Sequence, residues 1–84
     1  MAEKEVGKVT HYFRKIGVAV VELTDELKLG DTVHIKGGTA DFEQKVESME
    51  IEHEPVEKAV AGQSIGLKVA QKVRGKETVY KVIE

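Results

Sequence analysis

The sequence predicts an all-β domain, a small six-stranded closed β-barrel, and three observations lead to this prediction. Glycines interrupt the chain at short intervals, and the runs between them are rich in valine and isoleucine. Branched side chains of this kind fit the pleated, half-buried surface of a sheet. Six such runs follow one another at nearly even spacing, which is typical of a barrel that closes its exposed strand edges.

Each expected strand lies between two breaks rich in glycine or in turn residues. We expect strands at residues 7–13, 17–23, 32–36, 43–53, 64–72 and 78–83. Alternation of apolar and polar residues, as at Val33 and Ile35, places one side of each strand on a common core. In the run 43–53 the parity of the apolar positions changes between Val46 and Met49, which predicts a β-bulge near residues 47–48.

The segments between the strands predict turns and two single helical turns. Residues 36–41 and 74–76 are expected to be turns, the second closing a C-terminal hairpin. The segments 24–30 and 54–62 each end in a glycine and are expected to form one helical turn. Residues 1–5 are expected to fray. Residues 6–84 are expected to form a single domain, because so short a chain cannot divide into two cores.

Composition narrows the possible functions. The formal net charge is −2, whereas a protein that depends on phosphate contacts usually has a basic balance. The chain has no cysteine and therefore offers no disulfide, thiol nucleophile or thiolate ligand. Its charged start lacks the apolar run of a signal peptide, and no stretch is apolar enough to span a membrane. We therefore expect a cytoplasmic protein.

The serines and histidines form no motif of a catalytic or metal site. Neither Ser48 nor Ser64 stands in a nucleophile elbow, and a catalytic triad is defined by geometry and not by inventory. His53 lies between Glu52 and Glu54, but neighbours in a strand point to opposite faces and cannot converge on one ion. We expect a protein that is not an enzyme and has neither a metal site nor a cofactor.

Four segments carry glycines and apolar residues in a characteristic order. They are GKVT at 7–10, LKLGDTVHI at 27–35, SMEI at 48–51 and AVAGQSIG at 59–66. In this order they resemble the second domain of elongation factor Tu, a β-barrel of the translation-protein family. The runs IGVAVV at 16–21 and VYKV at 79–82 are also similar to the small barrel appended to some collagenase-like peptidases. The resemblance implies a stand-alone elongation-factor-like barrel.

The resemblance also implies where a ligand would bind. Glu50 matches a glutamate that lies near the end of aminoacyl-tRNA in elongation factor Tu, and His53 stands where that family has an arginine. Glu50 and His53 are therefore expected to line a pocket.

Other motifs of the sequence bear on GTP binding and on local structure. A phosphate-binding loop of the form Gly-x-x-x-x-Gly-Lys-Ser/Thr is absent from the sequence, so we expect no bound GTP. At Gly30-Asp31 we expect a tight turn, in which the glycine has a positive φ and the aspartate accepts backbone hydrogen bonds.

Charge is distributed unevenly along the chain. Basic residues gather near both ends, and carboxylates gather at 43–57. If the first and last strands share one side, a basic face forms there, and its candidate RNA-phosphate ligands are Lys8, Arg14, Lys15, Lys72 and Arg74. The alternative is a solvated surface that keeps a small sheet protein soluble.

Two functions follow from these observations. The first is a non-catalytic binding module related to translation factors, contacting RNA (tRNA or rRNA) or a translation-associated protein. The alternative is a protein-interaction subunit or cap of a larger enzyme complex, without nucleic-acid binding. In that case the acidic stretch 43–57 would be the contact surface.

Overall fold

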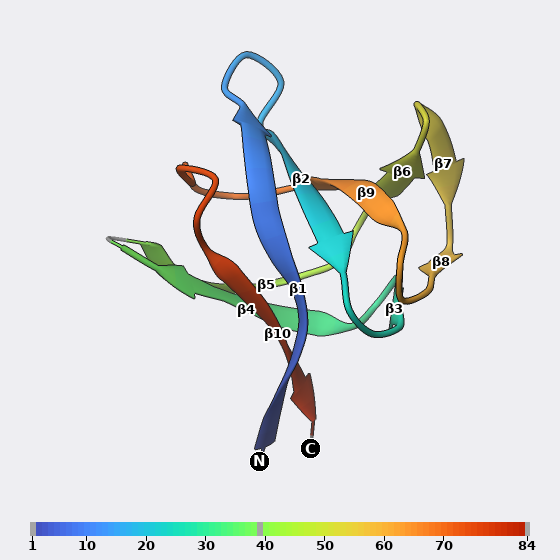
Figure 1. Ribbon diagram of the computed structural model, residues 1–84, viewed down its shortest axis with the longest axis horizontal. Helices are drawn as coiled ribbons and strands as arrows, with labels where there is room; N and C mark the ends of the chain where they lie inside the picture. Colours follow the sequence, from blue (N-terminus) through green and yellow to red (C-terminus); the bar gives the residue numbers. More distant parts are fainter. Residues whose placement is uncertain (1, 39, 84) are drawn as a thin grey trace.

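The computed structural model describes residues 2–38 and 40–83, and this part of the chain contains ten strands and no helix (Figure 1). The strands are β1 (Ala2–Phe13), β2 (Val18–Leu23), β3 (Leu27–Lys28), β4 (Thr32–Gly37), β5 (Ala40–Lys45), β6 (Met49–Ile51), β7 (Glu54–Val56), β8 (Lys58–Ala59), β9 (Ser64–Lys68) and β10 (Thr78–Ile83). The predicted all-β class is confirmed.

Eight of the strands form one sheet with the order β5-β4-β10-β1-β2-β9-β6-β7, while β3 and β8 form a separate pair. The large sheet curves around the centre of the molecule (Figure 1). Strands β5 and β7 remain its two ends, and no ladder joins them in the described residues. The predicted closed barrel is therefore wrong: the sheet is strongly curved but open.

The core is almost entirely aliphatic, as the composition indicated. In β4 Val33 and Ile35 are fully buried, and in β9 Leu67 is fully buried while its neighbours on either side face outward. The two-residue alternation therefore places one side of these strands on the core, as predicted. Removing the apolar side chains from water is the main stabilising contribution in a domain of this size.

The first strand is longer than expected. Residues 1–5 were expected to fray, but Ala2–Phe13 forms β1, in which Ala2 pairs with Ile83 and Glu5 with Tyr80 of β10. Met1 lies outside the described residues. The pairing register shifts between Glu5 and Gly7, which is a β-bulge in this strand. Pairing with β10 provides hydrogen-bond partners for the backbone N–H and C=O groups of this segment. The polar side chains of the segment do not indicate this pairing.

The predicted strand at 43–53 is two strands. β5 ends at Lys45 and pairs with β4, whereas β6 begins at Met49 and pairs with β7 and β9. Between them the Val46 N–H donates to the carbonyl of Asp31 at 2.8 Å, and Val46 is buried. The change of apolar parity thus marks a change of partner strand, and the bulge predicted near residues 47–48 is wrong.

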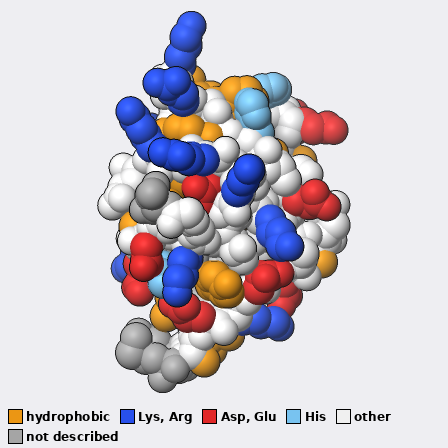
Figure 2. Space-filling model, turned by 60° about the vertical axis from the view of Figure 1, so that its left-hand side comes forward, with side chains coloured by type: hydrophobic (Ala, Val, Ile, Leu, Met, Phe, Trp, Pro, Cys, Tyr) orange, Lys and Arg blue, Asp and Glu red, His pale blue; other side chains and the backbone are white. Residues whose placement is uncertain are grey.

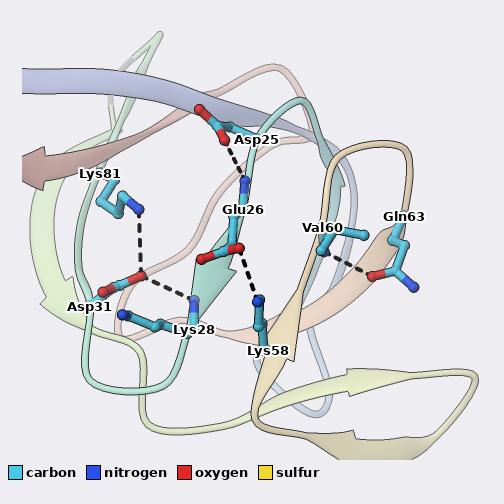
Figure 3. A network of polar contacts seen from close by, with 8 residues as sticks. All are labelled: Asp25, Glu26, Lys28, Asp31, Lys58, Val60, Gln63 and Lys81. Atoms are coloured by element: carbon cyan, nitrogen blue, oxygen red, sulfur yellow. Dashed lines mark hydrogen bonds and ion pairs between the residues drawn. The ribbon is translucent and has the colours of Figure 1, made fainter.

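The two predicted helical turns are strand pairs and bends instead. Leu27 of β3 pairs with Ala59 of β8, and both side chains are buried. A single helical turn is weak on its own, so burial and pairing between distant segments prevail. The turn at Gly30-Asp31 is confirmed: Gly30 has a φ of 90°, and the Asp31 carboxylate accepts the Lys28 N–H at 3.0 Å (Figure 3).

The predicted C-terminal hairpin is also wrong. Strand β9 pairs with β2 and β6, whereas β10 lies between β4 and β1. The segment between β9 and β10 therefore crosses the end of the molecule instead of turning back on itself.

Among the described residues there is no helix with the length and hydropathy needed to cross a bilayer.

Candidate functional site

The loop between β1 and β2, residues 14–17, separates two hollows at one end of the molecule. Its turn is closed by the Gly17 N–H, which donates to the Phe13 carbonyl at 2.9 Å, and Gly17 has a φ of 67°. Gly17 in turn accepts the Val69 N–H through its carbonyl at 3.0 Å, which ties the loop to the segment after β9. The loop carries two cations on one side and an exposed isoleucine, Ile16, on the other.

The first hollow, which we call the basic hollow, has a volume of about 640 Å³. It is lined by His11, Tyr12, Arg14, Lys72, Val73, Arg74 and Glu77. A shallower recess beside it is lined by Arg14, Lys15 and Lys72. Figure 2 shows Lys and Arg side chains gathered at this end of the molecule. Four of the five predicted basic residues are thus brought together, whereas Lys8 lies on β1 opposite Glu22 and lines neither hollow.

Glu77 fixes the loop that bounds the basic hollow. It is 2% exposed, and its carboxylate accepts the backbone N–H groups of Arg74, Gly75 and Lys76 at 2.9–3.0 Å. Burial, which would raise the pKa of Glu77, is outweighed by these backbone hydrogen bonds, so the pKa of this carboxyl group is lowered. This role cannot be recognised from the sequence, because a glutamate after a charged turn resembles an ordinary surface residue.

The second hollow, which we call the apolar groove, has a volume of about 280 Å³. It is lined by Phe13, Ile16, Val18, Val20, Glu50, Glu52, His53, Ser64, Ile65 and Gly66. The structure places Glu50 and His53, which the resemblance implied would line a pocket, in this groove. The apolar residues of the groove come from β1, the loop, β2 and β9, and this grouping was not predicted.

The floor of the apolar groove is a row of residues on the outer face of three strands. Val20 of β2 stands opposite Gly66 of β9, which stands opposite Glu50 of β6. Residues directly opposite in an antiparallel pair have their side chains on the same face. Gly66 has no side chain, and Val18 packs closely beside it. A Cβ at Gly66 would lie 3.2 Å from a methyl group of Val18.

The acidic rim of the groove includes an unusual turn. Glu52 and His53 connect β6 and β7 and have φ values of 52° and 67°. Such two-residue hairpin turns favour glycine or asparagine, because the left-handed conformation costs other residues about 1–2 kcal/mol each. His53 therefore lies in a turn and not in the strand expected from the sequence. The absence of a glycine here explains why this turn was not recognised.

A third cluster lies apart from both hollows, and the sequence did not indicate it. The Nδ1 atom of His34 is 2.7 Å from a carboxylate oxygen of Glu3, and its Nε2 atom is hydrogen-bonded to a carboxylate oxygen of Asp41. Asp41, and then Glu3, raise the pKa of His34, although burial acts in the opposite direction. Glu3, His34 and Glu43 also have potential ligand atoms within 4.8 Å of one another. Both ring nitrogens of His34 are already hydrogen-bonded, so binding of an ion by His34 would break its hydrogen bond to Glu3 or to Asp41.

Comparisons with known proteins show that the chain is similar to a part of proteins named as proteases. No family model matches it. The chain is 42% identical over 77 residues to an uncharacterised protease of Methanocaldococcus jannaschii, and the match covers 90% of the chain and 19% of that protein. It is 42% identical over 78 residues to a collagenase of Porphyromonas gingivalis, covering 90% of the chain and 22% of the collagenase. The chain thus spans about a fifth of the length of these relatives.

The fold is also found in a solved structure. The C-terminal domain of a Geobacillus thermoleovorans protein assigned to the U32 peptidases superposes with a TM-score of 0.88 and 23% sequence identity. The match covers 95% of this chain and 93% of that domain. At this identity the match shows a shared fold.

The comparisons support one part of the expected resemblance and correct the other. The similarity to collagenase-like peptidases is supported, whereas the identification with elongation factor Tu is not. The prediction of a translation-related, RNA-binding module is therefore wrong. The wrong prediction rested on short segments centred on glycine. Gly-Asp pairs at strand starts and closely spaced glycines allow tight turns and close strand packing, and many small curved sheets of unrelated function contain them.

Proposed function

We propose that this chain is a non-catalytic accessory domain that packs against the catalytic body of a collagenase-like peptidase. The observation that carries the proposal is the match of nearly the whole chain to about a fifth of two proteins named as a protease and a collagenase. A segment that corresponds to one complete fold, and that is also known as a separate C-terminal domain, is well suited to such a role.

The surface of the domain supports a role in protein contact. Two large apolar side chains, Phe13 and Ile16, are 46% and 62% exposed beside the apolar groove. The basic hollow lies on the other side of the same loop and offers Arg14, Lys72 and Arg74 to carboxylates of a partner. Neighbouring surfaces of opposite character favour one orientation of a docked protein over others.

An exchange of domains tests the proposal. We would compare three forms of the Porphyromonas collagenase: the intact protein, a form without the segment that matches this chain, and a chimera that carries this chain in its place. Gelatin hydrolysis should fall in the shortened form and recover in the chimera. Full activity of the shortened form would contradict the proposed role.

The isolated 84-residue chain tests the non-catalytic part. It should not hydrolyse gelatin. Ser64 and His53 line the same groove, so the Ser64→Ala variant is the informative control. Hydrolysis by the isolated chain that disappears in Ser64→Ala would overturn the non-catalytic assignment.

A further inference from the structure

We propose that the apolar groove is the docking site for a segment of the catalytic body that presents a large apolar side chain next to a lysine or arginine. This inference rests on the proposed function and names the surface that performs it. The groove is formed by the outer faces of β2, β9 and β6 together with the loop between β1 and β2.

The apolar part of the occupant follows from the groove walls. Phe13 and Ile16 leave about half of their surfaces in water, and Val18 and Val20 are only half-buried. Gly66 exposes its backbone between Val20 and Glu50, with the side chain of Val18 beside it, and these residues form the floor against which an apolar side chain would pack. Exposed apolar side chains around a recess are the usual feature of a protein-docking site.

The basic part of the occupant follows from charge. The carboxylates of Glu50 and Glu52 line the groove, and none of its lining residues is a lysine or an arginine. An incoming cation next to the buried apolar side chain would meet these two carboxylates. A carboxylate in the same position would be repelled, so the groove distinguishes between partners by charge.

The groove is also held in shape before a partner arrives. The rings of His11 and Phe13 pack edge to face with centroids 4.6 Å apart, which orients Phe13 on the wall. The hydrogen bond from Val69 to Gly17 holds the loop that carries Ile16. The opposite rim is the turn at Glu52 and His53, which is held by the pairing of β6 with β7. Preorganised walls reduce the conformational entropy lost on binding.

The test uses the chimera described above, with limited proteolysis of the junction between body and domain as a measure of docking. Ile16→Asp and Glu50→Lys should each accelerate release of the domain by at least about tenfold. Two controls match them on other surfaces: Val60→Ser, an apolar residue that is 45% exposed, and Glu57→Lys. Both controls should be released at the rate of the unmodified chimera.

The outcomes separate this inference from the proposed function. If the chimera is active and Ile16→Asp and Glu50→Lys are released at the rate of the unmodified chimera, the domain docks through another surface and the groove assignment is wrong. If Val60→Ser and Glu57→Lys are released as fast as the groove variants, the assignment is also wrong. Circular dichroism of each isolated variant establishes that it folds. If the isolated chain dimerises, and Ile16→Asp abolishes the dimer, the occupant is a second copy and the proposal is overturned.

Discussion

The side chain of Gln44 in β5 donates a hydrogen bond to the carbonyl oxygen of Lys68 at the end of β9, at 2.7 Å. Its amide oxygen accepts the N–H of Ala70, also at 2.7 Å. One side chain thus joins an end strand of the open sheet to the backbone that follows β9. The Gln44 side chain thus forms hydrogen bonds with a backbone carbonyl and a backbone N–H, the groups that a neighbouring strand would otherwise pair.

We predict that Gln44→Ala lowers the free energy of unfolding by about 0.5–1.5 kcal/mol, the usual net contribution of a hydrogen bond, because water can reach the exposed carbonyl and N–H that lose their partner. Urea denaturation measures this change. Amide hydrogen exchange at Ala70 should become faster, whereas exchange in β1 should change little. Gln44→Glu separates the two bonds, since it keeps the acceptor and loses the donor. An unchanged unfolding midpoint for Gln44→Ala would show that this bridge contributes nothing.

A second prediction concerns Glu77. Glu77→Gln should lower the free energy of unfolding by about 1.5–3 kcal/mol, the usual contribution of hydrogen bonds to a charged group. The pKa of Glu77 is lowered from the ordinary value of 4.5, so its stabilisation is complete above that pH and is lost as the pH falls through the folded pKa. Thermal melts between pH 7 and pH 3 should show a smaller acid loss in the variant. The exposed Glu57→Gln should behave like the wild type.

A third prediction concerns His34 and its two carboxylates. The pKa of His34 is raised above 6.5, so its contribution is complete below that pH and is lost as the pH rises through the folded pKa. The melting temperature of the wild type should therefore fall above pH 6.5, and this fall should be absent in His34→Gln. The double variant Glu3→Gln and Asp41→Asn should remove the same pH dependence. A fall that persists in both variants would assign it to another group.

A fourth prediction concerns Gly7, next to the bulge in β1. A Cβ at this position would lie 2.7 Å from a methyl group of Val21 and 2.8 Å from the carbonyl oxygen of Glu22. The backbone of β2 cannot move away without breaking its ladder, so Gly7→Ala should destabilise the fold by about 1–3 kcal/mol. Gly38→Ala is the comparison: a Cβ there meets nothing within 4 Å, although φ is 54°. It should cost about 1–2 kcal/mol through backbone strain alone. Urea denaturation measures both, and a loss of less than about 1 kcal/mol for Gly7→Ala would contradict the account.

Local patterns predicted those parts of the fold that local forces determine. Alternation identified the core-facing residues of β4 and β9, and the Gly30-Asp31 pair identified its turn. The division of 43–53 into β5 and β6 was missed, because it depends on Val46 bonding to Asp31 in a distant turn. The β3–β8 pair was missed for the same reason, since two residues form a strand only when a partner is present.

The positions of the expected site residues are described by the structure, whereas their role in binding stays a prediction. Glu50 and His53 lie in one groove, and Arg14, Lys15, Lys72 and Arg74 lie at one end of the molecule. The apolar groove lies where Val20, Gly66 and Glu50 stand side by side on three strands, and only the strand order brings these residues together. The carboxylate of Glu77 was overlooked because its partners are backbone N–H groups, which the sequence does not distinguish.

The central claim is that this domain docks on a peptidase body through the apolar groove, and hydrogen exchange tests it most directly. Exchange would be measured on the isolated chain and on the same chain within the collagenase chimera. We predict slower exchange in the chimera at residues 13–18 and 50–53, with little change at 32–36 in β4. Equal exchange rates at 13–18 and 50–53 in the two proteins would contradict docking through the groove.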